Sequence, residues 1–63
     1  MPILRNWRVL SYYSLEFEKE MLYLTGQVFN DTRFPDGAEI RTSAVIEMTK
    51  EYARTKNTEY ILE

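Results

Sequence analysis

The sequence predicts a small all-β domain of four or five strands, and three observations lead to this prediction. Aromatic and β-branched residues, which favour strands, gather in short runs along the 63-residue chain. In the clearest run, residues 21–29, apolar and polar side chains alternate with the period of a strand. The only clear turn is Pro35-Asp36-Gly37, where proline fixes φ, aspartate bonds its own backbone and glycine accepts a positive φ. Extended segments flank this turn, so we expect it to fix how the two halves of the sheet meet.

The first strand is expected over residues 6–13, which are dense in aromatic and β-branched side chains. Trp7 is the candidate for the largest side chain of the core. Residues 14–20 are charged and contain no glycine or proline. We predict a connection with little regular structure there, while one helical turn capped by Ser14 and a long hairpin remain open alternatives.

The second strand, residues 21–29, has an apolar face that includes Leu24 and Val28. Gly26 lies in its middle, which indicates a bulge, a sharp bend or a close approach of another backbone. A bend of this kind lets a few strands curl into a barrel. The predicted architecture is therefore a small SH3-like barrel.

After the turn, residues 38–49 are expected to form a long strand with a kink near Ser43, because Val45 breaks the alternation. A helix over residues 43–52, capped by Ser43, is the alternative and would give an α+β domain. Residues 52–63 are expected to form a closing hairpin. The predicted core comprises one or two side chains from each segment: Trp7, Val9, Leu22, Leu24, Val28, Ile40, Ile46, Tyr60 and Leu62.

Composition limits both size and chemistry. A chain of 63 residues forms one domain, residues 1–63, and buries too little surface to be very stable alone. Because there is no cysteine or histidine, disulfides and most metal sites are not expected, and association should supply the missing stability. We expect a homodimer formed by strand edges or by packing of aromatic faces, or a complex with another protein. The formal net charge of −2 argues against a nonspecific nucleic-acid binder.

Catalytic chemistry has little support in the sequence, and no cofactor is expected. Thr42-Ser43 has no histidine or adjacent lysine to activate it, so we expect no enzyme activity. Glu16, Glu18 and Glu20 alternate and could bind a divalent cation from one strand face. A solvated acidic edge is the simpler interpretation, and no metal site is expected.

Binding is the remaining class of function, because nine aromatic side chains exceed what so small a core can enclose. The alternative for each tyrosine is that it covers the core with its hydroxyl in water. Around the central turn, Arg33, Asp36 and Arg41 could clamp an anionic ligand, or form ordinary surface ion pairs. The candidate protein-interaction residues are all aromatic: Tyr12, Tyr13, Tyr23, Phe29 and Phe34.

The layout of turn and core residues, N-W…G-x-V…R-F-x-D-G-x-x-I-x-T-S…T…Y-x-L, spans nearly the whole chain. It resembles uncharacterised small proteins of phages, prophages and bacterial genomes. This resemblance implies a shared fold and a mobile-element origin, and no settled activity.

The function expected from these observations is a non-enzymatic protein-interaction module, with a phage-type inhibitor or regulator of a host system as its specific form. No export signal or membrane span is visible, so we expect the cytoplasm. The alternative is a small nucleic-acid- or small-ligand-binding domain that uses arginine and aromatic side chains, as small barrels do.

Overall fold

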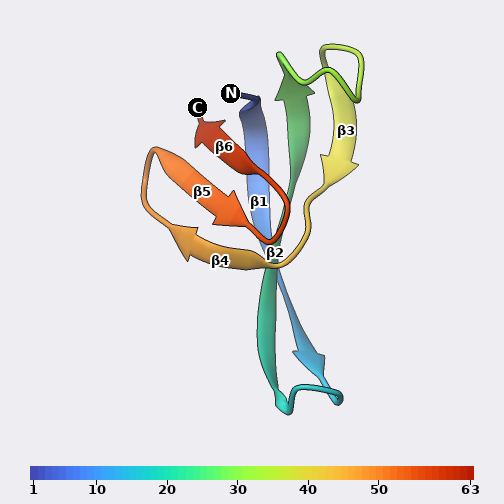
Figure 1. Cartoon of the computed structure of the whole chain (residues 1–63), viewed down its shortest axis with the longest axis vertical. Coiled ribbons are helices and arrows are strands. Elements are labelled where there is room, and N and C mark those ends of the chain that lie inside the picture. Colours follow the sequence, from blue (N-terminus) through green and yellow to red (C-terminus); the bar gives the residue numbers. More distant parts are fainter.

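Six strands form one sheet in the computed structural model, which describes all 63 residues (Figure 1). The strands are β1 (Ile3–Ser14), β2 (Lys19–Phe29), β3 (Ala38–Arg41), β4 (Val45–Met48), β5 (Tyr52–Thr55) and β6 (Glu59–Leu62). Their order in the sheet is β3-β2-β1-β6-β5-β4, and only the β1–β6 pair is parallel. No helix in the chain is long and apolar enough to cross a membrane.

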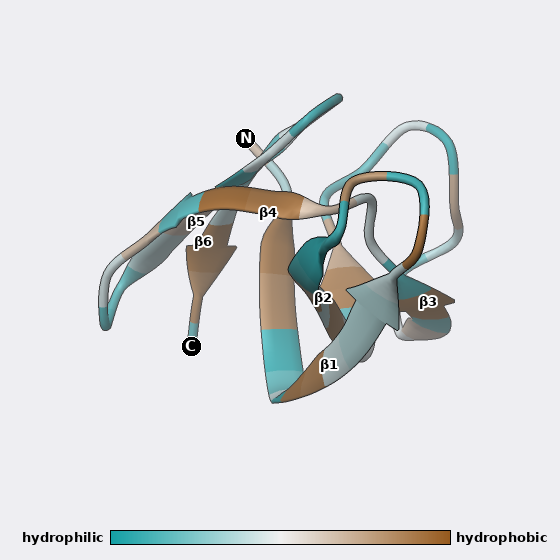
Figure 2. Ribbon diagram, turned by 90° about the horizontal axis from the view of Figure 1, so that it is seen from below, coloured by the Kyte–Doolittle hydropathy of each residue, from teal (hydrophilic) through white to brown (hydrophobic).

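The all-β prediction is confirmed, but the sheet has six strands and is not closed into a barrel, so the expected SH3-like barrel is not confirmed. The sheet nevertheless curls strongly, and β4 lies against β2 (Figure 2). The alternative helix over residues 43–52 is wrong, because β4 and β5 pair there as an antiparallel hairpin. The closing hairpin predicted over residues 52–63 is confirmed as β5 and β6.

The long strand predicted over residues 38–49 is wrong, because the chain divides near Ser43, where a kink was expected, into β3 and β4 at opposite edges of the sheet. Thr42 determines where the chain leaves β2. Its N–H donates to the Leu24 carbonyl at 2.8 Å, and its hydroxyl oxygen accepts the Leu24 N–H at 3.1 Å. The same hydroxyl donates to the Ser43 carbonyl at 2.8 Å, so a threonine side chain replaces the next ladder bond and turns the chain away from β2.

The predicted irregular connection over residues 14–20 is wrong, since a long hairpin, one of the open alternatives, forms instead. β1 and β2 stay paired from Arg8↔Thr25 to Ser14↔Lys19, and only residues 15–18 form the turn. Within it, the Phe17 N–H donates to the Ser14 hydroxyl at 3.3 Å, and Glu18 takes a positive φ of 53°. The charged side chains are exposed to solvent and do not prevent strand pairing.

Gly26 marks a close backbone approach, which was one of the predicted roles. A Cβ at Gly26 would lie 2.9 Å from the Arg5 carbonyl oxygen and 3.1 Å from the Trp7 Cα. The neighbouring strand bulges at this point, where the register shifts between Arg5 and Arg8 and Asn6 has a φ of 53°. The bend therefore lies in β1, and Gly26 provides the space for it.

The central turn is confirmed and connects β2 to β3. The Ala38 N–H donates to the Pro35 carbonyl at 3.1 Å, and Gly37 has a φ of 87°. The sequence predicts that the Asp36 carboxylate bonds its own backbone. Instead, it accepts the Asn30 N–H at 2.8 Å. Asp36 thus closes the whole loop between the strands and not only the turn.

The core lies inside the curl of the sheet and is small. Among the predicted core residues, Leu24, Val28, Tyr60 and Leu62 are buried, and Trp7 and Ile40 pack against them half-buried. Leu4 and Ala53 complete the buried cluster. The prediction is wrong for three residues, whose exposed fractions are 45% for Val9, 42% for Leu22 and 58% for Ile46.

Candidate functional site

Residues 9–24 project from the rest of the molecule as a two-stranded arm (Figure 1). β6 pairs with β1 only at Ile3 and Leu4, and β3 pairs with β2 only from Thr25 to Val28. Beyond these points, apart from the two hydrogen bonds between Leu24 and Thr42, the two strands pair only with each other. This accounts for a molecule 35 Å long and only 20 Å and 19 Å in its other dimensions. The arm therefore has two open edges and two open faces.

The arm carries most of the exposed apolar surface. Of the ten large hydrophobic side chains that are exposed, six lie on it. These six are Val9, Tyr12, Tyr13, Leu15, Phe17 and Leu22. The turn at its tip holds Leu15, 86% exposed, and Phe17, 59% exposed. An isolated two-stranded hairpin buries too little to be stable in water, and a gathered apolar surface of this kind is typical of interaction sites.

The outer face of the arm, defined by Leu10, Tyr12, Met21 and Tyr23, turns away from the core. Tyr12 and Tyr23 contact each other with ring centroids 5.9 Å apart and planes tilted by 59°. The Arg41 guanidinium lies 5.8 Å from the Tyr23 ring centroid and sits at the root of the arm. This face is therefore aromatic in its middle and basic at its root.

The inner face of the arm continues the core face of Leu24 and comprises Val9, Ser11, Tyr13, Glu20 and Leu22. The Ser11 hydroxyl donates to the Glu20 carboxylate in the middle of this face. All five of these side chains are exposed, whereas Leu24 at the root is buried, so no other strand covers this face. This explains why Val9 and Leu22 alternate as core residues do and yet remain exposed.

The predicted interaction residues divide into two groups. Tyr12, Tyr13 and Tyr23 come together on the arm, with Tyr13 on the face opposite to the other two. Phe29 lies at the far end of β2, where the Arg5 guanidinium covers its ring at 4.8 Å. Phe34 lies in the loop before β3 beside Arg33, whose guanidinium is 5.5 Å from its ring.

Sequence reasoning missed two of the three most exposed apolar residues of the arm, Leu15 and Phe17. Their signal was the alternation Leu15-Glu16-Phe17-Glu18, in which apolar side chains interrupt a charged, turn-forming segment. Because an apolar side chain gains nothing from exposure in a solvated turn, this alternation makes the two residues candidates for a binding contact.

The predicted anion clamp does not form, because each of its three residues has a different partner. Arg33 donates from its Nε and Nη2 to the Asp31 carboxylate at 3.0 Å and 2.7 Å, and Asp31 also accepts the Arg33 N–H. These side-chain hydrogen bonds lower the pKa of Asp31 and raise the pKa of Arg33. The Asp36 carboxylate accepts the Asn30 N–H, and Arg41 lies on β3 beside the root of the arm.

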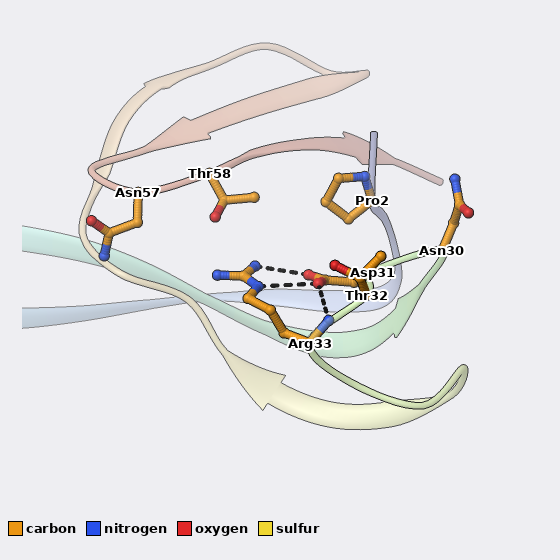
Figure 3. Close-up of a pocket in the computed structure, with 7 residues that line it drawn as sticks. All are labelled: Pro2, Asn30, Asp31, Thr32, Arg33, Asn57 and Thr58. Carbon is orange, nitrogen blue, oxygen red and sulfur yellow. Dashed lines mark hydrogen bonds and ion pairs between the residues drawn. The ribbon is translucent and has the colours of Figure 1, made fainter.

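Arg33 and Asp31 instead line an open polar pocket of about 450 Å³ (Figure 3). Its seven lining residues are Pro2, Asn30, Asp31, Thr32, Arg33, Asn57 and Thr58. Figure 3 shows the guanidinium paired with the carboxylate inside the pocket. Because Asp31 already balances the Arg33 charge, the pocket has no free cation to bind an anion.

The remaining ionisable groups are dispersed. Glu16, Glu18 and Glu20 do not converge, and nowhere in the chain do three acidic side chains cluster as a metal site would require. Two more arginines are engaged by carboxylates, in the pairs Arg5–Glu63 at 2.8 Å and Arg54–Glu47 at 3.6 Å. Thr42 and Ser43 have structural roles at the break between β3 and β4.

Comparison of the chain with protein-family models, with curated protein sequences and with solved structures finds no match in any of the three. We therefore infer function from the geometry of the arm and of the residues around it. The apolar, acidic tip and the aromatic outer face are the features that the core does not require.

Proposed function

We propose that the chain is a non-enzymatic protein-interaction module that docks to a partner protein through the tip of its arm. One observation carries this proposal: Leu15 and Phe17, at the point farthest from the core, are exposed by 86% and 59%. Binding energy concentrates in a few apolar and aromatic side chains that enter a pocket of the partner. A projecting hairpin tip is well shaped to enter such a pocket.

The charge on the arm specifies the partner further. The arm contains Glu16, Glu18 and Glu20 against a single base, Lys19, so its net charge of −2 equals that of the whole chain. A complementary partner presents an apolar pocket with lysine or arginine at its rim, since opposite potentials speed and orient docking. Phosphate groups would be repelled by the same tip. The proposed inhibitor or regulator role would follow if the tip fills a pocket that the partner needs.

A nucleic-acid-binding role is the second candidate, and the outer face of the arm favours it. Arg8 and Arg41 flank Thr25 in one cross-strand row, and Tyr23 and Tyr12 follow toward the tip. Arginine beside stacked aromatics is how single strands are bound without sequence preference. This candidate predicts salt-sensitive binding of a single-stranded oligonucleotide that Arg41→Ala weakens. No binding at low salt would eliminate it.

Affinity purification from the native host tests docking through the tip. We expect the wild-type chain to retain a specific protein that the double variant Leu15→Asp/Phe17→Asp loses, because aspartate cannot enter an apolar pocket. Ile46→Asp is the control: Ile46 is 58% exposed on β4, outside the arm, and its replacement should leave the partner bound. Retention of the same protein by the double variant, or its equal loss from the Ile46→Asp variant, would refute the proposal.

A further inference from the structure

The edge of β1 is unpaired along the arm, on the side away from β2. β6 occupies this edge only at Ile3 and Leu4 and leaves residues 8–14 open. The same segment contains no proline and no lysine, and Arg8 is its only charged residue. Natural sheets usually protect such edges with charges, prolines or bulges, because an open edge recruits another strand. This edge is protected only near its root, by the bulge between Arg5 and Arg8.

The hydrogen bonds that β2 makes to residues on its β3 side determine which N–H and C=O groups of β1 point out from the open edge. The Leu24 carbonyl accepts the Thr42 N–H, so the peptide groups of Leu24 point away from β1. Because these directions alternate along a strand, Tyr23 and Met21 bond across to Leu10 and Tyr12. The N–H and C=O groups of the intervening residues therefore point out from the open edge; these residues are Val9, Ser11 and Tyr13.

The open segment is self-complementary about Ser11. If two copies pair antiparallel with Ser11 opposite Ser11, then Val9 of each copy lies opposite Tyr13 of the other. Leu10 then lies opposite Tyr12 on the other face. Both are aromatic–aliphatic cross-strand pairs, which are among the more favourable in sheets. The outward-pointing residues also face one another in this register, so their hydrogen bonds can all form.

The charges agree with the same arrangement. Arg8 lies at the root of the arm and would lie opposite Ser14 of the second copy, next to its tip. That tip carries Glu16 and Glu18, so each end of the paired segment places a base of one copy near acids of the other. A two-fold axis repeats this contact at both ends.

We infer that a second copy of this chain docks on the β1 edge, with a two-fold axis at Ser11, and extends the two hairpins into one four-stranded antiparallel sheet. The inference goes beyond the proposed function, because it uses the backbone edge of β1 and requires no contact of Leu15 or Phe17, the side chains proposed to dock to a different partner. In the lower part of Figure 1, no other strand lies beside β1 on the side away from β2.

A single cysteine at the axis tests the inference, because the chain contains no other thiol. Facing Cα atoms of a hydrogen-bonded antiparallel pair are ~5.5 Å apart, within the range that a disulfide spans. We expect Ser11→Cys to form a covalent dimer under mild oxidation at least about tenfold faster than Thr32→Cys, since pairing raises the local thiol concentration to roughly millimolar. Thr32 is exposed on the loop after β2, away from the arm. Equal rates for the two variants would overturn the inference.

Ser11→Pro gives the complementary test, because it removes an outward N–H and leaves the bonds of Leu10 and Tyr12 to β2 in place. We expect the wild-type chain to sediment as a dimer at tens of micromolar and Ser11→Pro as a monomer. A monomeric wild-type chain would overturn the inference. If the monomeric chain still retained a partner through Leu15 and Phe17, the proposed function would stand. If the chain were a dimer but retained no partner through these two residues, the dimer would stand and the proposed function would be refuted.

Discussion

At the scale of single residues, Gly26 has no room for even the smallest side chain. An added Cβ would contact the Arg5 carbonyl at 2.9 Å and the Leu4 side chain at 3.1 Å, and the first of these is backbone that cannot turn aside. We therefore expect Gly26→Ala to lower the free energy of unfolding by about 1–3 kcal/mol, as overpacking does. Urea unfolding measures this. Glu39→Ala, on an exposed position of β3, should change it by less than about 0.5 kcal/mol, and an equally small effect at Gly26 would contradict the close approach.

Asp31 gives the stability a dependence on pH. Its side chain is only 5% exposed, and the hydrogen bonds from Arg33 lower its pKa below the ordinary value of 3.8. A carboxylate with a lowered pKa stabilises the fold fully above that ordinary value, and the contribution disappears as pH falls through the lowered pKa. Wild type should therefore exceed Asp31→Asn in stability by about 1 kcal/mol near neutral pH.

Thermal unfolding of the wild type and of the Asp31→Asn variant, measured from about pH 2 to about pH 7, checks this prediction. The difference in Tm between the two proteins should be constant above about pH 5 and should narrow steadily below about pH 4. A difference that is unchanged at the lowest pH would show that the Asp31 carboxylate contributes nothing through its charge.

At the scale of elements, the arm and the curled body should differ in local stability. The arm consists of two strands with both faces open, whereas β2 beyond Thr25 lies between β1 and β3 and carries the buried Val28. We expect amides of Leu10, Tyr12 and Met21 to exchange with solvent well before that of Val28 in dilute protein, because hairpins without a packed face open easily. Amide exchange followed by NMR measures this, and equal protection would indicate that the arm is an integral part of the core.

The elements also show how far the sequence could predict the fold. Alternation located β2 and its buried Leu24 and Val28, and asparagine in the last turn located the β5–β6 hairpin. The same alternation misplaced Val9 and Leu22 in the core, because it reports a face of a strand and not whether another strand covers that face. Residues 14–20 were misjudged since local charge says nothing about pairing that is decided by the register of β1 on β2.

At the scale of the whole molecule, the curvature of the sheet and its failure to close into a barrel depend on features that no local sequence pattern indicates. The parallel contact of β6 with β1 is limited to Ile3 and Leu4, and the bulge at Asn6 turns β1 away immediately afterwards. As a result, no other strand pairs with the arm and the sheet does not close into a barrel. Gly26 correctly indicated a close backbone approach but not these features. The candidate site was found in part, through its tyrosines, while Leu15 and Phe17 were hidden in a segment judged by its charges.

The body is expected to fold without the outer part of the arm. Replacing residues 13–20 by an Asn-Gly turn keeps Tyr12 opposite Met21, a pairing suited to a two-residue hairpin. All six residues of the buried cluster lie outside the replaced segment, so unfolding should remain cooperative and β-sheet circular dichroism should persist. A shortened chain that is unfolded would show that the arm stabilises the core directly.

The most direct test of the central claim, that the arm carries the protein's associations, is partner capture from the native host by this shortened chain beside the wild type. We predict that the shortened chain, folded as judged by circular dichroism, retains no partner that the wild type retains. Capture of the same partner by the folded, shortened chain would place the binding surface on the body and contradict the account.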